Sequence, residues 1–155
     1  MHQENLSITQ YNETGTSHME NNNVLEAKQI PLVAMDAMND VHREELTIVN
    51  CVSAAIADNN GAKITELCEQ WLEHTKAHFA RENTLMETHD FPAFHCHHGE
   101  HIEALQGLET IITAWQENAD LEALTIYVRR TWPEWYINHI STMDTVTSAY
   151  IKSCL

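Results

Sequence analysis

The sequence predicts an all-α protein: an up-down-up-down antiparallel four-helix bundle with an N-terminal arm. Apolar residues recur at helical spacing in four long stretches, and turn-forming residues separate these stretches. Only 4 glycines and 3 prolines occur among 155 residues, which favours long helices over a many-stranded sheet. The length suits one domain with a single core. We place that domain at residues 30–155 and the arm at residues 1–29.

The arm and the first helix meet near residue 30. Residues 1–29 are rich in Asn, Glu, Gln, Ser and Thr and show no apolar period, so we expect a mobile arm that is free to lie along the bundle. Pro31 suits the first turn of the first helix. The run DNNG at 58–61 ends this helix. Its apolar positions are Met35, Met38, Val41, Val49, Val52 and Ile56.

The second and third helices are predicted at about 62–88 and 94–117, on either side of a turn that contains Phe91 and Pro92. Apolar residues mark the inner side of each helix. They are Ile64, Leu67, Trp71, Phe79, Leu85 and Met86 in the second helix, and Leu105, Leu108, Ile112 and Trp115 in the third.

The fourth helix is predicted to begin after Asp120, a suitable N-cap, and to continue through Tyr150. Pro133 removes one backbone donor, so we expect a kink or a division near Trp132. The segment around His139 is expected to be a regular helix.

Composition excludes several classes of partner. The formal charge is -15 with only 8 Lys and Arg, whereas nucleic acids and anionic membranes both require basic patches. No run of 18 apolar residues occurs, so no membrane insertion is expected. The polar start lacks the pattern of a signal peptide, and we expect a cytoplasmic protein. The cysteines show no CxxC spacing and are expected to stay thiols, with Cys96 a small buried residue beside His97.

Seven residues have the chemistry and spacing of metal ligands. Because short loops make consecutive helices antiparallel, residues at equal distances from a loop lie at the same level of the bundle. This level matching brings all seven into one slab, where ionisable side chains among apolar neighbours are costly without a cation. Five imidazoles, two bridging carboxylates and one bridging oxygen fill all but one position of two octahedral irons. The residues are His42, the pair His78 and Glu82, the pair His97 and His101, and His139 with Asp144.

Other polar residues fit the slab less well. His98 points away from the face that His97 shares with His101, and His89 and His95 are set aside with it. His74 lies one turn before His78 and is expected at the edge of the site. Several acidic residues are expected on solvated helix faces, although Glu45 is near enough to His42 to hydrogen-bond a ligand. They are Glu44, Glu45, Glu87, Glu100 and Glu103.

The order H, HxxxE, HxxxH, HxxxxD on four helices resembles the hemerythrin family, including its bacterial single-domain members. The segments "HFARENTLM", "FPAFHCHHGEH" and "WYINHISTMD" carry the same resemblance, which covers about residues 30–152. The resemblance implies that His97, His101 and His139 bind one iron and that His42 and His78 bind the other. It also implies that Glu82, Asp144 and an oxo or hydroxo group bridge the irons, and that O2 binds at the open position of the two-histidine iron.

Two features depart from the family pattern. O2-carrying hemerythrins usually have Leu three residues before the last histidine, where this chain has Tyr136. The phenol could hydrogen-bond or reduce a bound oxidant, or its hydroxyl could instead face a neighbouring backbone or solvent. Pro133, just before it, could re-aim the pocket. We expect Trp135, Tyr136 and Ile137 around the O2 position.

Three functions follow as hypotheses. The first is reversible O2 binding for storage, delivery or sensing, without enzymatic turnover. The second is a di-iron redox enzyme that reduces peroxide or nitric oxide with Tyr136 participating. The third, a metal store, fits a saturated ligand set poorly. Ferritin-like sites use Glu-x-x-His pairs, which this chain lacks. A zinc enzyme would leave four of the seven residues unexplained.

Overall fold

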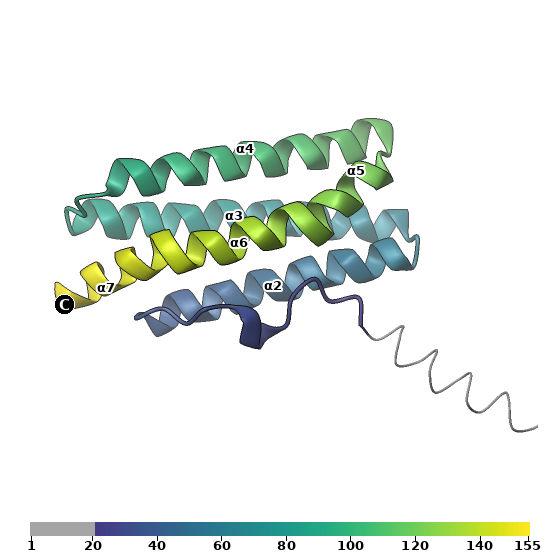
Figure 1. Cartoon of the computed structure of the whole chain (residues 1–155). Coiled ribbons are helices and arrows are strands. Elements are labelled where there is room, and N and C mark those ends of the chain that lie inside the picture. The colour runs from purple at the N-terminus through teal and green to yellow at the C-terminus, as the bar shows by residue number, and fades with distance from the viewer. Residues whose placement is uncertain (1–20) are drawn as a thin grey trace, which may run out of the picture.

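The computed structural model describes residues 21–155 and is all-helical over that range. Three long helices, α2 (Asp36–Ala57), α3 (Gly61–Thr88) and α4 (Phe94–Asn118), are followed by a fourth rod at 121–153. Figure 1 shows the four rods side by side, joined by short turns, so the prediction of a helical bundle is confirmed. The predicted bounds of α3 and α4 differ from the observed ones by a single residue at one end of each helix.

The fourth rod is built from five consecutive segments. Helix α5 (Leu121–Ile126) leads into a π-helical turn, Tyr127–Thr131, and helix α6 (Trp132–His139) into a second, Ile140–Asp144, before α7 (Thr145–Ser153). The first π turn lies just before Pro133, where a wider turn accommodates a residue without a backbone N–H. The expected division near Trp132 is therefore present. The expectation of a regular helix after His139 is wrong.

Local signals explain where the rods begin and end. The side chain of Asn60 accepts a hydrogen bond from the Lys63 N–H at the start of α3, and that of Asp120 accepts one from the Ala123 N–H at the start of α5. Asn59 and Ala119, with φ of 50°, have left-handed backbone that ends α2 and α4. The predicted N-cap role of Asp120 is confirmed.

The first helix begins later than predicted. Pro31 lies in an extended segment, and α2 begins at Asp36. The Asn39 side chain explains this difference, because its Oδ1 accepts from the Val33 N–H (2.8 Å) and its Nδ2 donates to the Val33 carbonyl (3.0 Å). These bonds satisfy the backbone of the extended segment without a helical turn.

The described part of the predicted N-terminal arm packs on the bundle, while residues 1–20 lie outside the described residues. Val24 N–H donates to Asn50 Oδ1 (2.8 Å), and Asn50 Nδ2 donates to the Leu25 carbonyl (3.2 Å). Val24 and Leu25 also pack against the large apolar cluster. This segment is therefore held to the bundle by backbone hydrogen bonds to Asn50 of α2 and by apolar packing.

Apolar side chains form a large and a small cluster. The large cluster includes Trp71 of α3 and Trp132 of α6, and the small one includes Met86 of α3 and Ile151 of α7. Along α3 and along the fourth rod, a stretch of buried polar residues separates the two clusters. Burial of the apolar clusters thus positions a polar layer between them.

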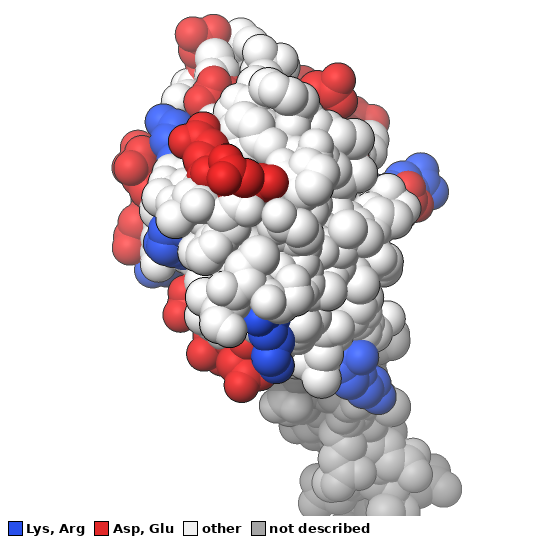
Figure 2. All heavy atoms as spheres, turned by 90° about the vertical axis from the view of Figure 1, so that its left-hand side faces the viewer, with Lys and Arg blue, Asp and Glu red and all other residues white. Residues whose placement is uncertain are grey.

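The charged side chains lie mainly around the edge of the end face that carries the C-terminus, and uncharged atoms fill much of its centre (Figure 2). Among the described residues, no helix is both long enough and apolar enough to cross a membrane.

Candidate metal centre

Seven polar side chains from all four rods meet in the layer between the apolar clusters. Each is at most 3% exposed, although histidines and carboxylates usually prefer water. α2 contributes one, and α3, α4 and the fourth rod contribute two each. These residues are the seven selected from the sequence, namely His42, His78, Glu82, His97, His101, His139 and Asp144.

The first set of ligand atoms, the three-histidine group, comes from Glu82, His97, His101, His139 and Asp144, and its atoms all lie within 4.8 Å of one another. Glu82 Oε1 is 3.3 Å from Nε2 of both His97 and His101. Asp144 Oδ1 is 3.2 Å from His97 Nε2 and 3.3 Å from His139 Nε2. Three imidazoles and two carboxylate oxygens therefore converge on one small volume.

The second set, the two-histidine group, comes from His42, His78 and Glu82, with its ligand atoms also within 4.8 Å of one another. Glu82 Oε2 lies 2.5 Å from His78 Nε2. Asp144 Oδ2 lies 2.9 Å from His42 Nε2. Glu82 and Asp144 thus each direct one oxygen to each group. This arrangement suits carboxylates that bridge two metal ions.

Most of the ligand atoms are buried without hydrogen-bond partners in the part of the chain that the structure describes, and the exceptions are His78 Nε2 and Glu82 Oε2, which pair with each other. Several approach one another within ion-pair distance but without hydrogen-bond geometry. Unpaired buried polar atoms are costly, and a cation would satisfy all of them at once. The donor set therefore fits two metal ions. The unpartnered atoms are Nε2 of His42, His97, His101 and His139, Oε1 of Glu82, and both carboxylate oxygens of Asp144.

Each imidazole of the three-histidine group contacts a polar partner at its other nitrogen. An Nδ1–H that donates to such a partner leaves Nε2 with the lone pair that binds a metal. The partner therefore sets both the tautomer and the ring orientation. The pairs are His97 with Thr147 Oγ1 (2.7 Å), His101 with Asn83 Oδ1 (3.0 Å) and His139 with Glu100 Oε1 (3.0 Å).

Glu45 serves the two-histidine group, with Oε1 3.5 Å from His78 Nδ1. Thr75 Oγ1 donates to the same oxygen (3.1 Å), and His74 Nδ1 lies 3.6 Å away. Burial alone raises the pKa of Glu45, but its contacts with His74 and His78 lower it to about 2. Glu45 is only 1% exposed, so the solvated-face interpretation is wrong, and its side chain instead contacts His78, a candidate ligand. His42 Nδ1 has no partner among the described residues.

The second π turn explains how two ligands five residues apart share one face. In a regular α-helix, residues five apart differ by about 140° around the axis. The wider turn at Ile140–Asp144 reduces this angle, so Asp144 and His139 face the same group. Thr145 Oγ1 donates to the Ile140 carbonyl (2.7 Å) and so satisfies a backbone group at this turn. The spacing HxxxxD and the π turn are thus two aspects of one local structure.

Without metal, opposite charges dominate the electrostatics of the layer. Burial by itself lowers the pKa of His97, but Asp144 and Glu82 raise it to about 9. Burial and Glu82 raise the pKa of Asp144, yet its contacts with the histidines bring it below its ordinary value. A protonated His97 therefore takes the place of a metal ion beside the ionised Asp144 and Glu82.

Tyr136 is buried beside the two-histidine group. Its hydroxyl donates to the carbonyl oxygen of His42 (2.9 Å), and its ring meets the His42 ring at 85° with the centroids 5.9 Å apart. Of the two orientations open from the sequence, the structure thus has the hydroxyl on a neighbouring backbone. This bond holds the segment that carries a candidate ligand.

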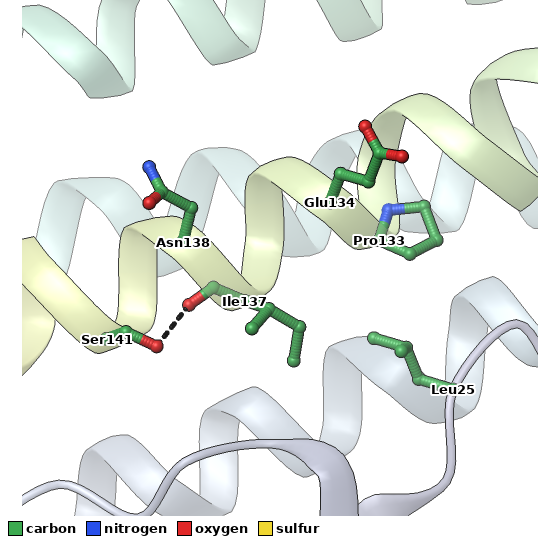
Figure 3. A pocket seen from close by; sticks show the side chains of 6 residues that line it. All are labelled: Leu25, Pro133, Glu134, Ile137, Asn138 and Ser141. Carbon is green, nitrogen blue, oxygen red and sulfur yellow. Dashed lines mark hydrogen bonds between the residues drawn. The ribbon is translucent and has the colours of Figure 1, made fainter.

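Trp135 and Ile137 occupy different environments. The Trp135 ring stacks on the ring of His139, with centroids 4.6 Å apart, and lines a small cavity with Glu45 and Thr75. The remaining cavity residues are Phe79, Ala104, Leu108, Tyr127 and Trp132. Ile137 lines a surface groove and points toward Leu25 (Figure 3). Its contribution to an O2 pocket stays a prediction.

Other candidates lie outside the two groups. Cys96 is exposed, so the expected buried position is wrong, because on a helix it faces about 100° away from the inward-facing His97. The His98 ring stacks on Phe94. His74 is at the edge of the site, as expected, where it also contacts Glu44 Oε2 (3.3 Å).

Sequence reasoning missed three polar partners, Asn83, Glu100 and Thr147. The sequence predicts a solvated face for Glu100, but its side chain is only 29% exposed and contacts His139. Thr147 carries a weak signal, because it lies one helical turn after Asp144 on the buried side. Asn83 and Glu100 carry none that separates them from ordinary surface residues.

Comparisons with known proteins agree with this geometry. The family model described as "Hemerythrin HHE cation binding domain" matches residues 31–150. A bacteriohemerythrin of Ralstonia nicotianae is 32% identical over 117 residues, which are 75% of this chain and 81% of that protein. One of Aquifex aeolicus is 22% identical (72% of this chain, 85% of that protein), and one of Stenotrophomonas maltophilia is 23% identical (79% and 78%). The chain therefore belongs to the hemerythrin family.

Proposed function

We propose that this protein holds two iron ions in an up-down-up-down bundle and binds O2 reversibly. One observation carries the proposal: two groups of buried ligand atoms share Glu82, and most of these atoms have no hydrogen-bond partner among the described residues. Membership of the hemerythrin family supports iron as the metal and O2 as its ligand.

The seven residues divide between the ions as follows. His97, His101 and His139 would hold one ion and His42 and His78 the other, with Glu82 and Asp144 in contact with both. The two-histidine position would then have one protein ligand fewer, which leaves room there for O2. When bound, two ferrous ions would supply the site at which O2 binds and one electron each to reduce it.

The surrounding side chains exclude water and hold the imidazoles. Tyr136 is 1% exposed, and its hydroxyl bond to the His42 carbonyl keeps that oxygen atom away from solvent. The small cavity lined by Trp135 and Glu45 has a volume of ≈ 10 Å³, about the room for one water-sized molecule. A diatomic gas is of similar size. Its mostly apolar wall supports entry of a neutral gas in preference to an ion.

The engagement of the Tyr136 hydroxyl also bears on the alternative, a di-iron enzyme that reduces peroxide or nitric oxide. A hydroxyl that donates to a backbone carbonyl has already used its only proton for a hydrogen bond. Direct donation of this proton to a reactant would require that bond to break. The geometry therefore favours O2 binding over turnover that uses the Tyr136 hydroxyl.

The test is an iron count combined with absorption spectra of the reduced protein before and after exposure to O2. We expect two irons per chain and a visible band that appears with O2 and disappears under vacuum. Glu82→Gln tests the shared carboxylate, and Glu87→Gln, an exposed position on the same helix, is the matched control. Two irons with irreversible oxidation would favour the redox enzyme, and absence of bound iron would exclude both functions.

A further inference from the structure

Five aromatic side chains form a connected series, the aromatic relay, beside the candidate metal centre. Its members are Tyr127, Trp71, Trp132, Tyr136 and Trp135. The ring of Trp71 lies 6.0 Å from Tyr127 and 5.9 Å from Trp132, measured between centroids. Trp132 stacks on Tyr136 at 4.2 Å, and Tyr136 lies 6.4 Å from Trp135. Every step thus joins neighbouring rings.

The relay contacts the ring of a candidate ligand in each group. Tyr136 meets His42 of the two-histidine group with centroids 5.9 Å apart. Trp135 stacks on His139 of the three-histidine group at 4.6 Å and 17° between the planes. Electronic contact between the relay and either metal position therefore needs only the imidazole ring between them.

Burial distinguishes the middle of the relay from its ends. Trp71, Trp132 and Tyr136 are between 0% and 4% exposed, whereas Tyr127 and Trp135 are partly exposed. The Nε1–H of Trp71 has no hydrogen-bond partner in the described part of the chain. A core that needed only apolar volume would not require an unpaired indole donor at its centre.

We propose that the aromatic relay delivers one electron from Tyr127 to the metal centre when peroxide is reduced there. The proposal rests on the proposed di-iron function. It concerns the state in which the iron pair can supply only one of the two electrons that hydrogen peroxide requires. The second electron moves from ring to ring through Trp71, Trp132 and Tyr136. Each buried ring that gives up an electron regains one from the neighbouring ring on the Tyr127 side.

The step balances in electrons and protons. The O–O bond of hydrogen peroxide breaks, and two electrons and two protons convert it into two water molecules. A ferrous ion held by the candidate ligands would supply one electron. Tyr127 supplies the other electron and loses its phenolic proton to solvent, so it becomes a neutral tyrosyl radical. The second proton comes from solvent. The radical then lies near the surface and away from the ligands, where an external reductant can reach it.

The radical is expected to remain on Tyr127 because this side chain can release its proton. The Tyr136 hydroxyl donates to a carbonyl oxygen, which is too weak a base to remove its proton. The Trp71 N–H has no acceptor among the described residues. Tyr127 is partly exposed and lines the small cavity, so water can accept its proton. Trp135 is the competing terminus because it is also partly exposed.

The test uses the full chain with two irons per chain verified. The centre is set to one ferrous and one ferric ion, mixed with hydrogen peroxide, frozen, and examined by electron paramagnetic resonance. We expect a tyrosyl signal that narrows when the tyrosines are ring-deuterated. Tyr127→Phe should abolish it, and Trp71→Phe should remove most of it. The matched controls Tyr150→Phe and Trp115→Phe should retain it, since Tyr150 packs on Phe91 in the small cluster and Trp115 donates to Thr65.

The outcomes separate the relay from the function on which it rests. Iron-loaded wild type without a radical would overturn the relay and leave O2 binding intact. A tryptophanyl signal lost in Trp135→Phe and kept in Tyr127→Phe would also overturn it, with Trp135 as the terminus. Absence of bound iron would overturn both proposals. Isotope labelling and the conservative Tyr127→Phe variant keep the test decisive even if loss of the buried Trp71 ring prevents folding.

Discussion

The two ligand groups of the centre differ in how the protein supports them. Each imidazole of the three-histidine group has a partner at Nδ1, and these partners are a threonine, an asparagine and a partly exposed glutamate. In the two-histidine group His78 faces the fully buried Glu45, and His42 Nδ1 has no partner among the described residues. The three-histidine group is therefore held by three separate hydrogen-bond partners, and the two-histidine group largely by the buried carboxylate of Glu45.

For the proposed pair of metal ions, this difference predicts two positions of unequal affinity. Partners at Nδ1 orient imidazoles and raise their basicity, so they tune metal affinity as well as geometry. The fuller set of partners and the larger number of ligands predict tighter binding at the three-histidine position. The two-histidine position has fewer restraints, as a position that exchanges a small ligand needs.

Glu82→Ala should have the largest effect, because its two oxygens face different groups. We expect loss of both irons and a chain that is strongly destabilised by unpaired buried histidines. His42→Ala removes a residue of the two-histidine group only, so it should keep one iron. Elemental analysis of the purified variants provides the measurement, with Glu87→Ala as the exposed control. Equal iron content in Glu82→Ala and His42→Ala would contradict the shared carboxylate.

The stability of the metal-free protein should depend on pH more than that of the loaded protein. The pKa of His97 is raised from 6.5 to about 9, so its contribution to folding is complete below about pH 6.5 and is lost as the pH rises through 9. The loss is about 3 kcal/mol if this shift is fully expressed. Bound metal replaces the proton, so the loaded protein should lack this decline.

Urea unfolding at a series of pH values, with and without iron, measures this dependence. The difference between the iron-free and iron-loaded curves tests whether protons and metal ions compete for the three-histidine group. A metal-free protein whose free energy of unfolding is constant between pH 6.5 and 9 would show that the histidines are neutral in the absence of metal.

Glu45→Gln should weaken the second iron by about 10- to 100-fold, the range seen when an outer partner of a metal-bound histidine is removed. Glu100→Gln should weaken the first iron by less, because Glu100 is partly exposed and Glu45 is fully buried. Titration against a chelator of known affinity resolves the two binding steps. Glu44→Gln, whose side chain is 63% exposed, is the control. An equal effect of Glu45→Gln on both steps would remove the distinction between the groups.

Tyr136→Phe should have the smallest effect, a loss of about 1 kcal/mol from the hydrogen bond to the His42 carbonyl. Denaturant unfolding of the metal-free variant measures it, since iron would mask a small change. The same variant should bind two irons. If it lost the second iron, the tyrosine would be more important to the two-histidine group than one backbone bond implies.

The long helices and the seven candidate ligands were predictable because their signals are local and periodic. The bounds of α3 and α4 follow from apolar spacing and from turn residues at their ends. His78 with Glu82, and His97 with His101, lie one helical turn apart, so spacing alone places each pair on one face.

The features that could not be predicted from the sequence depend on individual side-chain contacts and on local helix geometry. Thr147 reaches His97 across 50 residues, and Asn83 reaches His101 across 18. The late start of α2 depends on the side chain of Asn39, and the π turn after His139 brings Asp144 onto the ligand face. Propensity and period describe one element at a time, so they cannot report such bonds.

The most direct test of the central claim is anomalous diffraction at the iron edge from crystals of the iron-loaded protein. Two peaks are predicted, one bonded to His97, His101 and His139 and the other to His42 and His78, with Glu82 and Asp144 in contact with both. A single peak, or iron bound outside these seven residues, would contradict the two-metal centre.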